Sequence, residues 1–306
     1  MSTRVPSAVH RQHAGMPALW PETVRIWREL VLDNPMLGEA HREMRRLLRT
    51  ARAMGRGRMV AIGLILILYV WLIYEACVNS STGVGEDGAS LVCLYVELVI
   101  VTLVIPGSTY GAISGERERS TWDALVLTRL TPAQIVAGKL LWRLRTFACV
   151  SAFTLPLLIP CVFSDLRRFF PSCGVVILSQ VLIGCWVLLL ATFTLWVSSI
   201  TARSIASLAV TGVTLLMYLL MIPGLNAALS ATIGAYPYET ASWFIAGLNP
   251  FAELATLFDT HRVWFYPADS LPMSFWTASG TYAVAISVFL ALTYRRIARL
   301  GEPSMK

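Results

Sequence analysis

The chain has 306 residues, of which 56% are hydrophobic and 14% are charged, whereas a soluble domain is about 45–50% apolar and about 25% charged. Its mean hydropathy is +0.63 and its formal net charge is +7. This composition excludes a disordered chain, disfavours a soluble enzyme and predicts a protein that lies largely in lipid.

The segment 1–58 is mostly polar and contains one predicted helix. Asn34 and Pro35 give an N-cap followed by proline at the first helical position. Apolar residues then recur every three or four positions, and arginines lie on the opposite side. This pattern predicts an amphipathic helix on the inner membrane surface; the alternative is a solvated helix that only fixes orientation. The arginines expected at lipid phosphates are Arg42, Arg45, Arg46 and Arg49.

The region 59–294 is predicted to cross the membrane six times. A bilayer core about 30 Å thick requires about 20 apolar residues of helix. No stretch alternates strictly between apolar and polar residues, so we expect an all-α membrane protein rather than a barrel. The six predicted spans are Met59–Cys77, Leu91–Ile113, Thr146–Phe163, Gly174–Val197, Ile205–Ile222 and Thr277–Tyr294.

The distribution of basic residues predicts the orientation of these spans. With both termini in the cytoplasm, the inner segments contain 22 of the 25 Lys and Arg residues, as the positive-inside rule requires. This explains the net charge without nucleic acid and predicts a multi-pass protein of the cell (inner) membrane, with lipids as partners. The inner segments are 1–58, 114–145, 198–204 and the short tail 295–306.

Glu97 lies about two turns into the second predicted span. An ionisable group at that depth is costly unless it faces a cavity or a partner helix. Two interpretations remain open. Glu97 lines a substrate path, or it is an interfacial carboxylate that reaches outward or stays protonated.

The inner loop 114–145 contains two patterns that start helices. Ser120 with Asp123 predicts a short helix that ends near Leu130, and Thr131 with Gln134 predicts a second helix that continues into the third span. The short helix would show Trp122, Leu125 and Arg129 on one face. Such a helix suits docking of a partner; the alternative is an amphipathic connector anchored at the membrane interface.

Four cysteines lie near the outer ends of predicted spans. Cys77 with Cys93, and Cys161 with Cys173, could each close an outer hairpin by a disulfide. The favoured alternative is that these are small apolar residues in membrane helices. The chain has no Cys-x-x-Cys pattern and no Cys/His cluster, so we expect no metal site and no cofactor.

The outer segment 223–276 is rich in aromatic residues, which are typical of a membrane interface. Trp243–Gly247 and Phe251–Asp259 are predicted to form short helices there.

The loop 111–143 resembles the signature loop of type 2 ABC export permeases. The resemblance rests on Glu116 to Glu118, a Leu-rich short helix, the Thr131-Pro132 start and Gly138-Lys139. Asn34-Pro35 resembles the start of that family's interface helix, and Leu248 to Phe251 resembles a piece found before its last span. Ser120 departs from the family, which usually has glycine there.

This resemblance implies a permease subunit of an ATP-driven exporter. It implies a cytoplasmic coupling helix docked on a separate ABC ATPase subunit, and a second permease subunit of the same or another kind. The chain itself has no Gly-x-x-x-x-Gly-Lys-Ser/Thr motif, so we expect no ATP hydrolysis by it. The alternatives are a membrane scaffold or signalling protein without a motor, and a membrane-embedded lipid-modifying enzyme. The residues implied in coupling are Glu116, Glu118, Trp122, Asp123, Leu125 and Arg129.

Overall fold

A computed structural model describes residue 71 and the ranges 86–127, 130–163, 169–233, 247–261 and 273–301. Every regular element in these ranges is a helix, which confirms the all-α prediction for this part of the chain. The helices are α4 (Glu86–Thr109), α5 (Ser114–Glu118), α6 (Trp122–Leu127), α7 (Pro132–Phe163), α8 (Phe169–Ile200), α9 (Ser204–Ile233), α11 (Pro250–His261) and α12 (Met273–Gly301).

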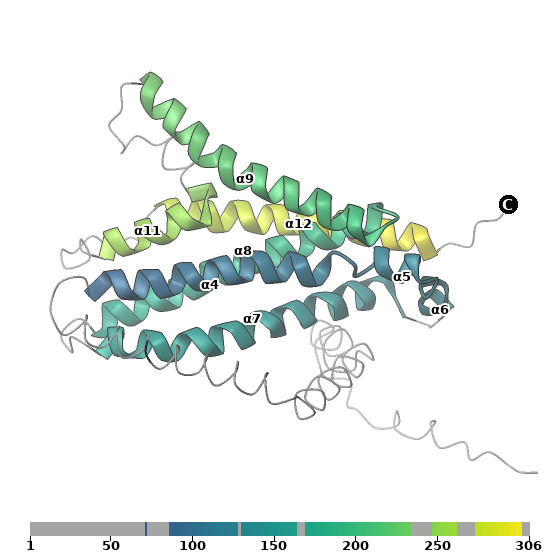
Figure 1. Ribbon diagram of the computed structural model, residues 1–306, viewed down its shortest axis with the longest axis horizontal. Coiled ribbons are helices and arrows are strands. Elements are labelled where there is room, and N and C mark those ends of the chain that lie inside the picture. The colour runs from purple at the N-terminus through teal and green to yellow at the C-terminus, as the bar shows by residue number, and fades with distance from the viewer. Residues whose placement is uncertain are drawn as a thin grey trace, which may run out of the picture.

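The long helices α4, α7, α8 and α12 run side by side, and α9 diverges from them toward its C-terminal end (Figure 1). The short helices α5 and α6 lie at one end of the bundle. The end of α12 lies at this same end, whereas α11 lies toward the opposite end. Three inner segments predicted from charge therefore meet in space. Ile113 and Trp122 form one apolar cluster with Leu195 of α8 and Ile297 of α12, and Glu118 bonds to the first residue of α9, Ser204.

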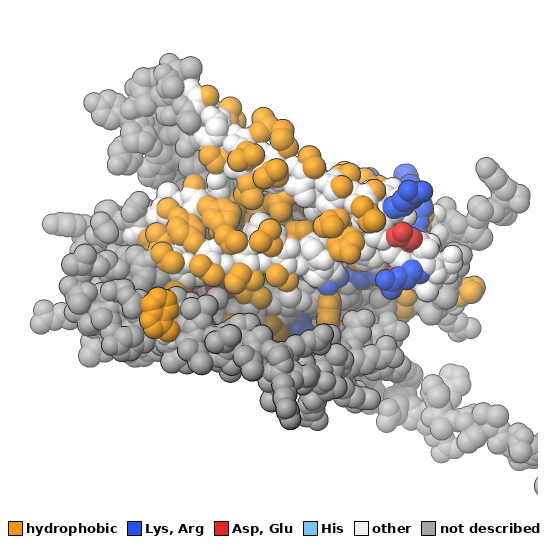
Figure 2. Space-filling model, in the orientation of Figure 1, with side chains coloured by type: hydrophobic (Ala, Val, Ile, Leu, Met, Phe, Trp, Pro, Cys, Tyr) orange, Lys and Arg blue, Asp and Glu red, His pale blue; other side chains and the backbone are white. Residues whose placement is uncertain are grey.

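Four helices of the described part are long and apolar enough to cross a membrane, so the chain is a multi-pass membrane protein. On the face that Figure 2 shows, apolar side chains are spread along the long helices. The four helices coincide with the second, fourth, fifth and sixth predicted spans. The third predicted span lies within α7, which is not among these four, and the first lies outside the described residues apart from Trp71. The spans are Leu91–Glu118, Cys173–Ile200, Ser204–Leu225 and Phe275–Leu300.

Helix α8 occupies the centre and packs against α4, α7, α9, α11 and α12. Its Trp186 is 1% exposed, and its ring lies 5.8 Å from the rings of both Tyr218 of α9 and Tyr282 of α12. The Trp186 Nε1–H donates to Thr102 Oγ1 of α4 over 2.9 Å. One side chain thus joins three spans to the central helix.

The start of α11 fixes the far end of the bundle. Asn249 Oδ1 accepts the Phe251 N–H at 3.0 Å, which caps the helix while Pro250 occupies the first position. The Leu248 carbonyl accepts the hydroxyls of Tyr218, at 2.6 Å, and Tyr282, at 2.9 Å. The helix predicted at Phe251–Asp259 is confirmed, and the one predicted at Trp243–Gly247 lies outside the described residues except Gly247.

Candidate functional site

The candidate site is the segment that follows α4, here called the α5–α6 segment (residues 110–127). A five-residue helix such as α5 leaves most of its backbone N–H and C=O groups without partners inside the helix. At its start, Ser198 Oγ of α8 accepts the N–H groups of both Ile113 and Ser114 at 3.0 Å. The helix is therefore held by a residue more than 80 positions away.

The hydroxyls of Ser114 and Ser198 complete this contact. They lie 3.1 Å apart and are buried, and the Ser114 hydroxyl lies 3.0 Å from the Tyr110 carbonyl. A hydroxyl has one donor and two acceptor positions. Because Ser198 accepts two N–H groups, its own hydrogen goes to Ser114, which donates to Tyr110. Every polar group in this chain of bonds is satisfied.

The charged end of α5 contacts the corner between α8 and α9. The Glu118 carboxylate accepts the Ser204 hydroxyl and, at 3.2 Å, the Ser204 N–H. An anion is favoured at this place because the helix dipole is positive at the N-terminus of α9. Arg117 Nη1 donates to the Thr201 carbonyl at 3.5 Å. The family-implied residue Glu118 therefore joins α5 to α9.

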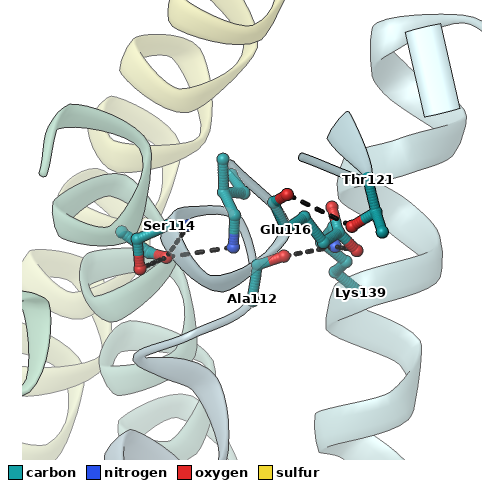
Figure 3. Close-up of polar contacts among 7 residues, drawn as sticks. Ala112, Ser114, Glu116, Thr121 and Lys139 are labelled. Carbon is teal, nitrogen blue, oxygen red and sulfur yellow. Dashed lines mark hydrogen bonds and ion pairs between the residues drawn. The ribbon is translucent and has the colours of Figure 1, made fainter. Parts of the chain in front are cut away.

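Glu116 joins α5 to α7. Its Oε1 lies 2.7 Å from the Lys139 Nζ, and Lys139 also donates to the Ala112 carbonyl (Figure 3). The lysine side chain is 9% exposed and the glutamate side chain 30%. An ion pair shielded to this degree is less screened than a surface pair and holds two elements in one relative position.

Ser120 forms the turn between α5 and α6. Its N–H donates to the Arg117 carbonyl at 3.1 Å, and the Thr121 N–H donates to the Glu116 carbonyl at 2.8 Å. This pair of bonds is a Schellman motif, which requires a left-handed residue at the position of Ser120. Its φ is 56°. Glycine adopts such a φ without a steric cost. The motif also overturns Ser120 as the N-cap of the next helix, which begins at Trp122.

We expect Ser120→Gly to stabilise the protein by about 1 kcal/mol, because glycine adopts a positive φ without the steric cost of a Cβ atom. The measurement is the thermal unfolding midpoint in detergent. Ser120→Ala is the matched control, since it also removes the hydroxyl but keeps the Cβ. An equal rise in both variants would contradict the assignment of strain to this residue.

Helix α6 places its predicted face against the bundle. Trp122 is 6% exposed and packs in the cluster with Ile113 and Ile135, and Leu125 packs against the same cluster. Trp122 is therefore inside the protein rather than on an accessible docking face. Among the α6 side chains that the structure describes, Leu127 is exposed, at 85%. The side chain of Asp123 and all of Arg129 lie outside the described residues.

The start of α7 agrees with the sequence. The Thr131 N–H donates to Gln134 Oε1 at 2.9 Å, and the Gln134 N–H donates to Thr131 Oγ1 at 3.3 Å. These reciprocal bonds form the predicted capping box, with Pro132 at the first helical position. Helix α7 then continues without a break to Phe163, so the second loop helix and the third predicted span are one element.

Glu97 lies inside the bundle, 0% exposed. Its Oε1 accepts a hydrogen bond from the Ser151 hydroxyl of α7 over 2.6 Å. Its Oε2 accepts hydrogen bonds from the Thr154 hydroxyl of α7, over 2.7 Å, and from the Gln180 amide of α8, over 2.8 Å. The interpretation of a carboxylate that reaches out to the interface is wrong, because three donors from two neighbouring helices surround it. Its role in a substrate path stays a prediction.

Other predicted residues are separate from this site. Cys93 and Cys173 are free thiols, whereas the possible disulfide partners Cys77 and the Cys161 side chain lie outside the described residues. The interface-helix residues Arg42, Arg45, Arg46 and Arg49 also lie outside. The described part of the chain contains no group of three or more His, Cys, Asp or Glu residues suited to a metal ion.

The contacts that hold the α5–α6 segment include residues that the sequence does not single out. Ser198, Thr201 and Ser204 hold the α5–α6 segment from the next inner turn. Their only signal in the sequence is a concentration of hydroxyl residues within 198–204, which is also typical of an ordinary helix corner. In the sequence, Lys139 belongs to the Gly138-Lys139 pair, which gives no sign of its ion pair with Glu116.

Comparison with models of known protein families gives no match for this chain, and comparison with curated proteins gives none. The resemblance of the loop 111–143 to type 2 ABC export permeases therefore rests on the residues quoted for it.

Proposed function

We propose that this protein is the membrane-spanning permease subunit of an ATP-driven ABC exporter, and that a separate ATPase subunit docks on the α5–α6 segment. The observation that carries the proposal is the attachment of this segment. It contacts α7 through Glu116, α8 through Ser114 and α9 through Glu118. A force applied to the segment would therefore reach three long helices through named polar contacts.

The exposed tip of α6 supports a docking role. Leu127 is 85% exposed at the charged end of the bundle, while Trp122 fixes the other end of the helix in the core. A short helix that is anchored by a buried aromatic side chain and presents an exposed apolar side chain is suited to insertion into a groove of a partner. Trp122 is then a positioning residue, and Leu127 is the contact residue.

The charge pattern supports a cytoplasmic location for this end. The inner segments contain 22 of the 25 basic residues, and such residues remain on the cytoplasmic side of the cell (inner) membrane. Two permease subunits, identical or different, would enclose the transport path. The partner would supply the energy, since Gly138-Lys139 is followed by Leu140 rather than by the Ser or Thr of a phosphate-binding loop.

The test is co-expression with a phosphate-binding-loop ATPase encoded by an adjacent reading frame. We expect the two chains to co-purify, and Leu127→Ser to lower recovery of the ATPase about tenfold, as loss of an interface hot spot does. Val284→Ser is the matched control, because Val284 is an exposed apolar residue in the middle of α12. Failure of the wild-type chain to retain such an ATPase would contradict the proposal, and equal recovery with both variants would contradict the docking residue.

A further inference from the structure

A polar cleft of about 630 Å³ lies between the α5–α6 segment and the first turns of α7. Its basic lining residues are Arg119, Lys139 and Arg143, and its acidic lining residue is Glu116. Three cations against one carboxylate leave the lining with an excess of two positive charges. A concave surface of one net sign concentrates ligands of the opposite sign.

The positive charges differ in how they are held. The Lys139 Nζ donates hydrogen bonds to the Glu116 carboxylate and to the Ala112 carbonyl. The carboxylate of the cleft is therefore already neutralised. Arg143 is 9% exposed and belongs to α7. Arg119 is exposed and lies at the end of α5. A cleft with buried cations and an accessible guanidinium at its edge is suited to an anion with several oxygen atoms, because guanidinium binds such groups bidentately.

The position of the cleft indicates where that anion comes from. The spanning helix α4 ends at Thr109, and the next residue, Tyr110, lines the cleft together with Trp142. Aromatic residues with a polar edge are typical of the headgroup level of a membrane. Figure 2 shows apolar side chains along the long helices and basic side chains gathered toward the α5 end. The cleft therefore lies where the apolar surface gives way to the charged one.

We propose that this cleft binds the phosphate headgroup of an anionic membrane lipid. The phosphate would contact Arg119, beside Lys139 and Arg143 of the cleft lining, and the acyl chains would remain in the bilayer. Because the cleft is lined by both the α5–α6 segment and α7, a bound headgroup would fix the two together. The occupancy of this site would then make the behaviour of the segment depend on lipid composition.

The experiment measures lipid binding to the delipidated full-length protein in detergent by native mass spectrometry. The probes are phosphatidylglycerol and phosphatidylcholine with the same acyl chains. We expect phosphatidylglycerol to bind more tightly, and Arg119→Gln to weaken its binding about tenfold, as loss of one charge-assisted contact does. Arg299→Gln is the matched control, because Arg299 is an exposed arginine in the last turn of α12 and does not line the cleft.

Three outcomes would overturn the proposal. The first is equal affinity for the two lipids, and the second is an equal loss of affinity in both arginine variants. The third comes from a competition arm with soluble glycerol phosphate. If this headgroup fragment displaces phosphatidylglycerol at equal concentration, the site takes free phosphate compounds rather than lipid. Retention of the lipid in that arm, with the loss confined to Arg119→Gln, supports the proposal.

Discussion

Replacing Glu97 by alanine is expected to destabilise the protein by about 2–4 kcal/mol, since it removes three hydrogen bonds between helices and leaves their donors buried. The donors are the hydroxyls of Ser151 and Thr154 and the amide of Gln180. They belong to α7 and α8, so the loss would loosen the contact of α4 with both helices. The measurement is the midpoint of thermal unfolding in detergent.

Two control variants separate this effect from a general one. Val96 is the neighbour of Glu97 on the same helix and is 51% exposed, so Val96→Ala should change stability by less than about 0.5 kcal/mol. Glu97→Gln keeps an acceptor oxygen and should lie between alanine and the wild type. If Glu97→Ala unfolds at the same temperature as Val96→Ala, the cluster around Glu97 contributes nothing to the fold.

The second large effect is expected from the ion pair that joins α5 to α7. We expect Lys139→Met to destabilise the protein more than the double variant Lys139→Met with Glu116→Met. The single change leaves the Glu116 carboxylate in a shielded position without its cation, whereas the double change removes both charges. The interaction energy in a double-mutant cycle should be about 1–3 kcal/mol.

The measurement is the unfolding midpoint of the wild type, the two single variants and the double variant under one condition. Raising the salt concentration should reduce the interaction energy only weakly, because the Lys139 side chain is 9% exposed and salt screens buried pairs less than exposed ones. Additive effects of the two changes would show that the pair does not hold the segment to α7.

Local rules predicted the parts of the fold that local interactions determine. The Thr131–Gln134 capping box is made within four residues, and the structure forms it as the sequence indicates. Lipid requires long apolar helices, so four of the predicted spans coincide with helices able to cross a membrane. The helix predicted at Phe251–Asp259 is also formed, as part of α11, which Asn249 caps.

The rest depends on contacts between distant residues. The donors to Glu97 lie 54, 57 and 83 positions away, so no pattern near Glu97 distinguishes an interhelical cluster from an exposed carboxylate. Helix α5 depends on Ser198 in the same manner. In a helix of six residues, periodicity identifies the apolar face but does not show whether that face meets the bundle or a partner. Trp122 was therefore assigned to docking, although it lies in the core.

Thr192 and Thr194 also show that the local sequence does not determine the hydrogen-bond partner of a side chain. A polar side chain inside an apolar membrane helix is often part of a hydrogen bond between helices. The structure instead has Thr192 Oγ1 donating to the Leu188 carbonyl at 2.8 Å and Thr194 Oγ1 to the Leu190 carbonyl at 2.7 Å, within α8. A threonine in a helix can satisfy itself on the preceding turn, and only the packing of the neighbours decides which partner it takes.

The most direct test of the account is the side of the membrane on which the tip of α6 lies. A single cysteine at Leu127, in a chain whose six native cysteines are replaced by alanine, would be labelled with a membrane-impermeant maleimide. Lysed membranes give the total label. The account predicts full labelling in inside-out vesicles and almost none in intact cells, because an ATPase has access to the segment only from the cytoplasm. Labelling in intact cells that equals the total would contradict it.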